Sequence, residues 1–376
     1  MSSSYDVIIV GGGPAGTAAA ITAARSGRIP GSDSPSVLLL EQGSFPRQKV
    51  CGEFVSAESL ELLRELLLPS ASLLEGALQI AWARLHIVGQ AAVALPIAPA
   101  AAGIARWDLD HSLWQAARLA GADCRERIAV ERVQRQNGGF AVITQAGAFH
   151  GRSVIDASGR WSKLNAAYVQ ARAKPARQPH RVGLKAHFHE PDLVSPWARI
   201  ATEVYFFRGG YCGVLPMGGG RINVCAMVES ARGTSLIQVF RQHPALWERS
   251  RGWTQEYEPI ATAPLLFRAL QADGEGVLHC GDAAGFIDPF AGDGISLALR
   301  GGALAAHSLA PFWQGRSSLD QAVAHYRAEY QKRYVRAFRM AAALRHVLNG
   351  PPWFLAAIAH ALRLPLFARL IVKTTR

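Results

Sequence analysis

The chain has 376 residues, 49% of them hydrophobic, and a formal net charge of +12. A chain of this length is expected to form two domains with a large buried core. Its five cysteines are odd in number and include no C-x-x-C pair, which argues against a disulfide framework or a metal site and favours a reducing, cytoplasmic compartment. No signal peptide is expected, because the first apolar run begins at residue 7 with no basic segment before it.

The first expected elements are a buried strand over residues 7–10 and a helix over residues 17–25. The run Val-Ile-Ile-Val is typical of a parallel strand, and the following segment is rich in alanine. Between them Gly11, Gly13 and Gly16 form a G-x-G-x-x-G pattern. In that pattern the first glycine permits a tight turn, the second lets the backbone approach a pyrophosphate, and the third lets helix and strand pack closely. The sequence therefore predicts a dinucleotide held at a helix N-terminus.

A second strand, over residues 37–40, ends at Glu41. A carboxylate at that position can accept both hydroxyls of an adenosine ribose. The polar loop at residues 27–36 makes the spacing from the glycine pattern longer than usual. Further on, Arg47 and Lys49 lie where cations can meet phosphates or ring oxygens, and a solvated loop is the alternative interpretation.

The middle of the chain mixes helices and strands. Ser56 is expected to cap a helix over residues 57–68, and a second helix begins at Arg106 and stops at Gly121. Next come a hairpin with strands at residues 129–133 and 140–144 and a strand at residues 153–156 that is expected to return to the nucleotide sheet.

From residue 182 to about residue 264 the pattern changes to strands joined by glycine-rich turns. The expected strands are residues 183–189, 202–207, 211–215 and 221–228. Such an antiparallel sheet, inserted between parts of a nucleotide-binding domain, is a plausible substrate-binding layer. Its aromatic residues either line a pocket or fill a core, and both interpretations stay open: Tyr205, Phe206, Phe207 and Tyr211.

The last expected strand of the nucleotide sheet, residues 276–280, leads into a second ligand-facing loop. Asp282 at its end is placed to accept hydroxyl groups. The turn at residues 292–294 precedes a helix over residues 295–307, so bare N–H groups and a positive dipole end meet there.

With these motifs, the chain resembles FAD-dependent oxidoreductases of the geranylgeranyl reductase type, relatives of flavoprotein monooxygenases and flavin-dependent halogenases in the glutathione-reductase-like FAD superfamily. The resemblance runs from Asp6 to about Leu304 and has four anchors. They are Gly11–Gly16 with Glu41, Arg47-x-Lys49-x-Cys51-Gly52, Asp156-Ala-Ser-Gly159-Arg160, and Gly281-Asp282 through Pro289 to Gly294-Ile295.

The resemblance implies an α/β composite fold: a Rossmann-like FAD-binding domain with an inserted antiparallel β-sheet substrate domain and a C-terminal helical segment. It also implies that Glu41 binds the ribose, that Asp282 bonds the ribityl or pyrophosphate region, and that the turn at residues 292–295 lies beside the N1/O2 edge of the flavin. The residues expected to bind FAD are Gly11, Gly13, Pro14, Ala15, Gly16, Glu41, Gln42, Arg47, Lys49, Cys51, Gly52, Arg106, Ala157, Ser158, Gly159, Gly281, Asp282, Pro289, Gly292, Asp293, Gly294 and Ile295.

The chain departs from related families at two points. Aromatic hydroxylases usually carry a histidine after Asp-Ala-Ala, where this chain has Gly285, and the Trp-x-Trp-x-Ile-Pro segment of tryptophan-type halogenases is absent. Halogenation is therefore disfavoured. There is no second G-x-G-x-x-G before a helix, so an external reductant, NAD(P)H or an electron donor protein, is expected to reach the flavin transiently.

The first functional hypothesis is a flavin enzyme that reduces or oxidises carbon–carbon bonds of a lipophilic isoprenoid- or polyketide-like molecule. The second is a flavin monooxygenase that hydroxylates a similar or aromatic molecule with O₂. The third is a basic nucleic-acid-associated flavoprotein, although no nucleic-acid recognition module is visible. Cys51, Glu53 and Tyr211 are the candidate catalytic residues.

The C-terminal region carries most of the positive charge, with ten Lys/Arg and one acid in residues 321–376. An apolar stripe recurs there at helical spacing: Tyr330, Tyr334, Phe338, Ala341, Leu344 and Leu348. The stripe either lies on the anionic inner face of the cell membrane or packs on the protein's own core. The expected domains are residues 1–70, 100–180 and 270–310 (FAD-binding), 71–99 and 181–269 (substrate-binding), and 311–376 (basic, helical).

Overall fold

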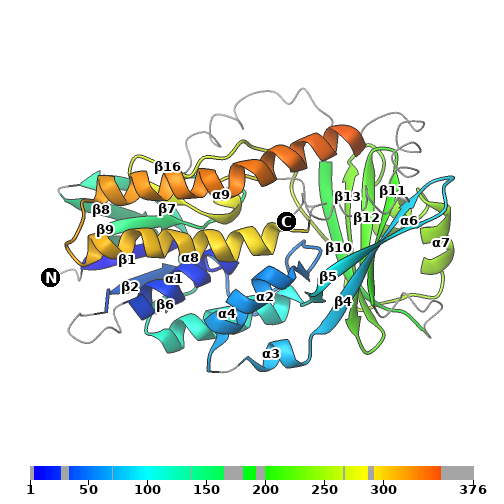
Figure 1. The fold of residues 1–376 in the computed structure, drawn as a ribbon, viewed down its shortest axis with the longest axis horizontal. Coiled ribbons are helices and arrows are strands. Elements are labelled where there is room, and N and C mark those ends of the chain that lie inside the picture. The colour runs from blue at the N-terminus through cyan, green and yellow to red at the C-terminus, as the bar shows by residue number, and fades with distance from the viewer. Residues whose placement is uncertain are drawn as a thin grey trace.

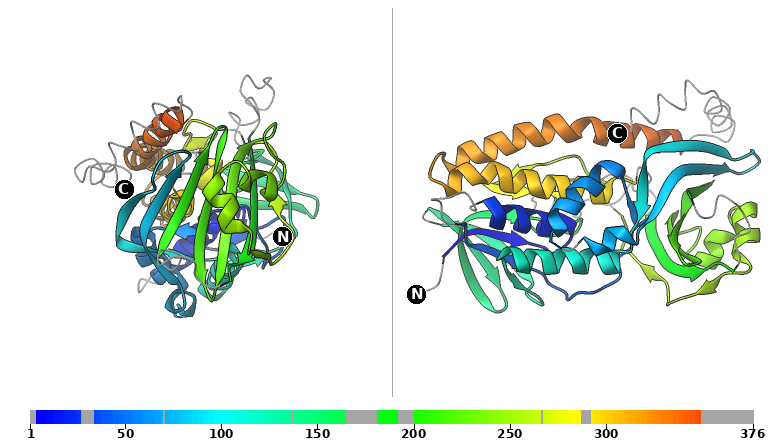
Figure 2. Two further views of the ribbon diagram at one scale, coloured as in Figure 1. Left: turned by 90° about the vertical axis from the view of Figure 1, so that its right-hand side faces the viewer. Right: turned by 60° about the horizontal axis from the view of Figure 1, so that its bottom comes forward.

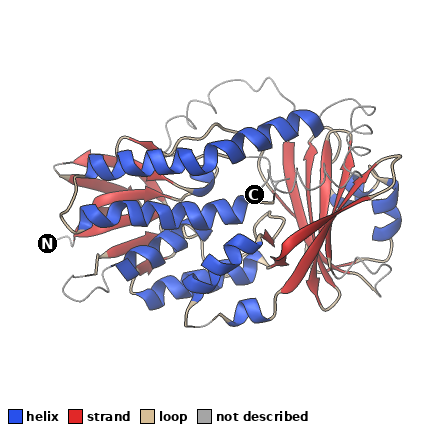
Figure 3. Ribbon diagram, viewed as in Figure 1, coloured by secondary structure: helices blue, strands red, loops and turns tan. Residues whose placement is uncertain are grey.

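The computed structural model describes residues 4–26, 34–69, 71–136, 138–164, 181–191, 200–265, 267–286 and 292–348. Two β-sheets lie at opposite ends of an elongated molecule, and long helices run between them along the long axis (Figure 1). Figure 3 shows the same division, with most helices beside the first sheet. The predicted α/β fold with an inserted sheet is confirmed.

The first sheet is built around parallel strands whose residues are buried on both faces. Its main path runs in the order β16-β17-β9-β1-β2-β6, and β8 pairs with β9 and β7. Each of residues 7–10 is at most 6% exposed, as expected for a central parallel strand covered by helices. The strands are β1 (Ser4–Val10), β2 (Val37–Leu40), β6 (Asp123–Arg125), β7 (Val130–Gln136), β8 (Gly139–Thr144), β9 (Gly147–Asp156), β16 (Asp273–Gly274) and β17 (Val277–His279).

The helices that accompany this sheet pack unusually closely where small residues meet. At Gly302 an added Cβ would lie 2.0 Å from the carbonyl oxygen of Ala15, so only glycine allows α1 and α8 to approach this far. The helices are α1 (Pro14–Ser26), α2 (Ala57–Leu67), α3 (Ser72–Glu75), α4 (Arg106–Ala120), α8 (Gly294–Trp313) and α9 (Leu319–Leu348), with a 3₁₀ turn η2 (Gly281–Ala283).

The second sheet runs in the order β14-β10-β13-β12-β11-β4-β5-β3, with β15 paired to β10. The prediction of a purely antiparallel sheet is wrong at one place: β4 and β11 pair in parallel, where the two segments of chain that build the sheet meet. The strands are β3 (Phe54–Val55), β4 (Leu78–Ile87), β5 (Val93–Gly103), β10 (Arg181–His189), β11 (Ala201–Phe207), β12 (Gly210–Gly218), β13 (Arg221–Glu229), β14 (Thr254–Gln255) and β15 (Ile260–Ala261).

Two short helices, α6 (Leu236–Phe240) and α7 (Pro244–Ser250), cover the outer face of the second sheet (Figure 2). The inner face points toward the first sheet and its helices. The second sheet also takes in β3 and the end of β5 at Gly103, which lie within the ranges predicted for the FAD-binding domain. The exact domain boundaries stay a prediction.

The C-terminal apolar stripe packs on the protein itself as far as its side chains are described. Tyr330 and Tyr334 are 1% and 5% exposed and belong to the same core as α1 and α8, and Phe338 packs against that core. The membrane-facing interpretation of these three residues is therefore wrong. The side chains of Leu344 and Leu348 lie outside the described residues. Within the described part of the chain, no helix is both long and apolar enough to cross a bilayer.

Candidate functional site

The glycine turn lies at the carboxyl edge of the parallel sheet, between β1 and α1. Gly11 has φ +104°, and a Cβ there would lie 2.4 Å from the carbonyl oxygen of Ala157. At Gly16 a Cβ would lie 1.8 Å from the carbonyl oxygen of Gly11, whereas at Gly13 no atom lies within 4 Å. Gly11 and Gly16 therefore fix the turn, and Gly13 leaves open space in front of the helix that begins at Pro14.

Glu41 closes one side of this space and is held by three donors. Its Oε2 accepts from the backbone N–H of Gly12 at 2.8 Å, and its Oε1 accepts from Gly43 N–H and Arg47 Nη1, each at 2.8 Å. Burial would raise the pKa of Glu41, but the hydrogen bond and charge of Arg47 outweigh it and lower the pKa. Three of the roughly four acceptor sites of the carboxylate are thus occupied, and about one is left for a ligand hydroxyl. Gln42, the next residue, is exposed.

A cluster of cations lies beside Glu41. Arg106 pairs with Asp110 through two hydrogen bonds of 2.7 and 2.6 Å. Within the described residues, Lys49 Nζ has no hydrogen bond or ion pair, and burial together with the charges of Arg47 and Arg106 lowers its pKa. Three cations therefore meet two carboxylates, which leaves one positive charge for an anionic ligand. A pyrophosphate fits this arrangement, and so FAD fits it.

The turn after β9 forms the opposite wall. The buried Asp156 accepts from Ser158 N–H at 3.0 Å and from His279 Nδ1 at 2.9 Å, which fixes the predicted residues Ala157 and Ser158 in place. Gly159 follows with φ +85°. Sequence reasoning had noted Asp156 only as part of the motif and missed His279 as its partner.

Asp282 lies at the end of β17, as predicted, next to Gly281 in η2. Arg160 Nε lies 3.6 Å from its Oδ2, and the Arg160 guanidinium lies over the ring of Phe286 at 4.6 Å. The carboxylate of Asp282 is about one-third exposed (34%), so it retains access to a ligand despite this partner.

The second helix N-terminus that points into this region is that of α8. Gly292 has φ +71°, Asp293 is the N-cap without a side-chain capping bond, and Gly294 is the first residue of the helix. A Cβ at Gly292 would lie 3.1 Å from the ring of Phe54. Ser56, expected to cap its own helix, instead bonds Ser296 Oγ at 2.8 Å. These contacts tie residues 54–56 to the start of α8, where Ile295 is buried. Pro289 lies outside the described residues.

The candidate catalytic residues separate into two places. Cys51 is half-buried, with Asn223 Nδ2 donating to its carbonyl oxygen at 3.1 Å, and at Gly52 a Cβ would meet no atom within 4 Å. Glu53 is fully buried at φ +60°, so it does not face an open site. Tyr211 lies apart from both, in an apolar group with Phe286.

Glu53 has two partners that sequence reasoning missed, both on β10. Its Oε1 accepts from Lys185 Nζ at 2.5 Å and its Oε2 bonds His187 Nε2 at 2.7 Å, and all three side chains are 0% exposed. The only signal for them was the alternation of β10, which places Lys185 and His187 on one face. Burial would raise the pKa of Glu53, but the hydrogen bond from His187 and the charge of Lys185 hold it below its usual range.

The alternation of the second sheet divides its aromatic residues between the two faces. Tyr205 and Phe207 pack into the core under α6 and α7. Phe206 and Tyr211 are directly opposite each other on β11 and β12, with ring centroids 6.2 Å apart. They belong to the inner face, where Tyr211, Met227, Leu265, Phe267 and Phe286 form an apolar group.

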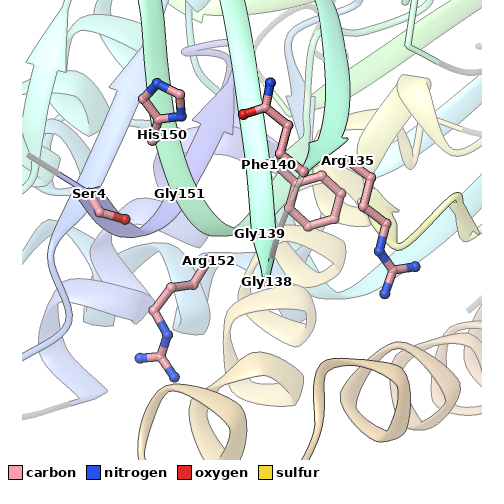
Figure 4. A pocket seen from close by; sticks show the side chains of 9 residues that line it. Ser4, Arg135, Gly138, Gly139, Phe140, His150, Gly151 and Arg152 are labelled. Carbon is pink, nitrogen blue, oxygen red and sulfur yellow. The ribbon is translucent and has the colours of Figure 1, made fainter. Parts of the chain in front are cut away.

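A separate cleft of about 470 Å³ lies at the far edge of the first sheet, near the start of β1. Figure 4 shows the side chains of Arg135, His150 and Arg152 around it. Arg152 already pairs with Asp6 at 2.7 Å, and Arg135 lies 3.4 Å from Asp320. The cleft is not the nucleotide site, because the glycine turn and Glu41 are at the opposite edge.

Comparisons with known proteins agree with this geometry. The FAD binding domain family matches residues 4–341. Menaquinone reductase of Mycolicibacterium smegmatis is 26% identical over 93% of this chain and 86% of its own length. A geranylgeranyl bacteriochlorophyll reductase-like protein of Thermoplasma acidophilum superposes with a TM-score of 0.78 at 21% identity, covering 99% of this chain and 95% of that one. A flavin-dependent brominase superposes with a TM-score of 0.79 at 20% identity, covering 99% and 93%.

Proposed function

The chain belongs to the FAD binding domain family and is an FAD-dependent oxidoreductase, and we propose that it reduces carbon–carbon double bonds of a lipophilic isoprenoid- or polyketide-like substrate. The observation that carries the proposal is the inner face of the second sheet. Beside the Cys51–Glu53 segment this face is polar, with Lys185, His187 and Asn223. Toward β11 and β12 it is apolar, so a long apolar chain has a surface to lie on.

FAD, when bound, supplies the hydride. The residues of the chain that would hold it are the glycine turn and Glu41 for the adenosine half, and Arg47 and Lys49 for the phosphates. The start of α8 at Gly294 would place N–H groups and a positive dipole end beside the ring system, which stabilises negative charge there. Water is kept away by the apolar residues of the inner face.

Position 285 supports reduction over hydroxylation. Aromatic hydroxylases usually carry a histidine there. A Cβ on Gly285 would lie 2.7 Å from the ring of Phe338 and 3.2 Å from the carbonyl oxygen of Ala269, so no larger side chain fits unless α9 moves. Ala283, Ala284 and Phe286 beside it are buried and apolar. Residues 283–286 therefore offer no side chain for proton transfer to an oxygenated product.

Relatives point in the same direction for the substrate. The menaquinone reductase and the geranylgeranyl reductase-like protein are named for molecules with isoprenoid chains. We propose NAD(P)H or an electron donor protein as the source of electrons, since the sequence has no second dinucleotide pattern.

The test is anaerobic conversion of defined isoprenoids by FAD-loaded protein whose flavin has been photoreduced. Geranylgeranyl diphosphate and a menaquinone are the two probes. We expect the product to gain two hydrogens per double bond reduced, with one flavin reoxidised for each. Conversion only in the presence of oxygen, with label from ¹⁸O₂ in the product, would instead establish the monooxygenase hypothesis.

For the partner surface, we propose that the outer side of α9 meets an anionic membrane. Lys332, Arg336 and Arg339 line a groove there together with Val335 and Met340, and the three basic residues are exposed. Basic side chains beside apolar ones suit an anionic interface.

We expect the full-length protein to co-sediment with vesicles containing phosphatidylglycerol but not with phosphatidylcholine alone. The Lys332→Gln/Arg336→Gln/Arg339→Gln variant should lose this binding, and the charge-matched control Arg64→Gln/Arg118→Gln/Arg127→Gln should keep it. Equal loss of vesicle binding in both variants would show that only the net charge of the protein matters and would contradict the proposal. Binding of DNA in place of vesicles would favour the nucleic-acid hypothesis.

A further inference from the structure

The buried Lys185–Glu53–His187 group has one nitrogen, Nδ1 of His187, without a hydrogen-bond partner among the described residues. If His187 is neutral and donates from Nε2 to Glu53, its Nδ1 is an unprotonated acceptor. Within the described residues this buried Nδ1 has no hydrogen-bond partner, and the nearest charged atom is Glu256 Oε2 at 3.7 Å. Two acceptors therefore face each other, and a proton between them would turn repulsion into attraction.

Glu256 connects this end to solvent. Its side chain is 31% exposed and is held by Arg221 through two hydrogen bonds of 2.7 Å. Tyr257 covers His187 from the same loop, with ring centroids 5.3 Å apart, and its hydroxyl also lacks a partner among the described residues. The 3.7 Å distance is too long for a hydrogen bond, but a water or a small movement can close it.

The inner end of the group is attached to the expected flavin site. Glu53 follows Cys51 and Gly52 directly, accepts from the backbone N–H of Arg106 at 2.7 Å, and precedes Phe54, whose ring contacts Gly292. Lys185 also donates to Gln48 at 2.9 Å. An imidazole with one nitrogen toward the partly exposed Glu256 and one toward this buried pair can carry a proton between them.

We propose that His187 is the proton carrier of this enzyme, taking a proton at Nδ1 from solvent by way of Glu256 and passing one from Nε2 to the Glu53–Lys185 pair. The inference rests on the proposed function, because saturating a double bond takes a hydride, which carries both electrons, and one proton. The hydride is the flavin's contribution. The proton goes from the Lys185 ammonium to the second carbon of the double bond. The neutral lysine regains a proton from His187 Nε2 through the Glu53 carboxylate, and His187 takes one from water by way of Glu256, so no other reagent is needed.

Four charged groups in the described part of the chain lie around His187. Glu53 and Glu256 favour the charged ring, whereas Lys185 and Arg221 oppose it, and Tyr257 is neutral. An additional negative charge on the reduced flavin acts in the same direction as the two carboxylates and favours the charged ring. Reduction of bound FAD should therefore be accompanied by uptake of a second proton at His187, beyond the one that the flavin itself takes.

The test counts protons and needs no substrate. In FAD-loaded protein at about pH 8, where free imidazole is mostly neutral, the number of protons bound per two electrons follows from the pH dependence of the flavin midpoint potential. We expect two for the wild type and one for His187→Gln. The matched control is His86→Gln, because His86 also bonds a buried carboxylate, Glu203 at 2.7 Å, but on the outer face of the same sheet. It should bind two.

One proton in the wild type, or two in His187→Gln, would overturn the proposal. Should His187→Gln fail to fold, ¹⁵N spectra of wild-type histidine rings give the same answer, since one ring must become doubly protonated on reduction. No change in any ring would also overturn it. If two protons are taken up but no double bond is reduced, the carrier stands and the proposed reaction fails.

Discussion

Replacing Glu53 by glutamine should leave a fully buried charge, that of Lys185, without its counter-ion. The amide keeps the shape of the side chain but leaves the Lys185 ammonium, 0% exposed, without its counter-ion. Removing one partner of a buried pair costs about 3–5 kcal/mol. This loss has an upper limit, because the buried lysine can instead become neutral. Removing the proton from a lysine in water, with a reference pKa near 10.4, costs about 4.6 kcal/mol at pH 7. The expected loss in free energy of unfolding is thus about 3–4.6 kcal/mol.

The upper limit of this loss becomes smaller as the pH rises, so the pH dependence of the loss tests the prediction. Each pH unit lowers the cost of the neutral lysine by about 1.4 kcal/mol, so at pH 9 the loss should be no more than about 2 kcal/mol. Urea unfolding followed by tryptophan fluorescence at both pH values measures it. The control is Glu256→Gln, an exposed residue paired with Arg221, for which we expect about 1 kcal/mol or less. A loss below about 1 kcal/mol for Glu53→Gln at pH 7, or a loss that grows with pH, would refute the reasoning.

Three further predictions follow from the same contacts. Gly13→Ala should fold normally but lose FAD binding, because its Cβ enters the open space expected to hold the cofactor, whereas Gly16→Ala should destabilise the fold. Thermal melting of the apoprotein and titration with FAD separate the two effects, and a destabilised Gly13→Ala protein would contradict this prediction. Lys49→Gln should weaken FAD binding about tenfold or more, because a hydrogen bond to a charged group contributes about 1.5–3 kcal/mol, and an unchanged Kd would show that Lys49 does not contact the cofactor. The Glu203 carboxylate has its pKa lowered from 4.5 to about 2, because the His86 hydrogen bond and the Arg249 charge outweigh burial. Its stabilising effect should therefore be complete above pH 4.5 and disappear toward pH 2, so the stability difference between wild type and Glu203→Gln should shrink as the solution is acidified; a constant difference would contradict the assignment.

The cofactor half of the site could be predicted because its signals are local. A strand, three glycines and a helix follow one another within residues 7–25, and Glu41 ends the next strand, so parallel-sheet geometry brings them to one edge without further information. The same holds for the glycine turn before α8. Even there the partners were not predictable: that Arg47 holds Glu41 depends on how a loop folds back.

The inner layer of the site could not be predicted, because its contacts join distant parts of the chain. Glu53 and Lys185 are 132 positions apart, and nothing in either local sequence indicates that they meet. Glu53 was predicted as a candidate catalytic residue, but its complete burial and its two partners on β10 could not be predicted. The apolar stripe of α9 was ambiguous for a related reason: helical spacing shows that residues share a face, not what covers that face.

The central claim is that the flavin lies between the start of α8 and the Cys51–Glu53 segment, with the apolar inner face of the second sheet beyond it. A crystal structure of the FAD complex tests this most directly. We predict the pyrophosphate at Gly13 and Lys49, the ribose on Glu41, and the ring system beside Gly292–Ile295 and Cys51. A ring system bound elsewhere, for example with FAD in the cleft lined by Arg135 and Arg152, would contradict the account.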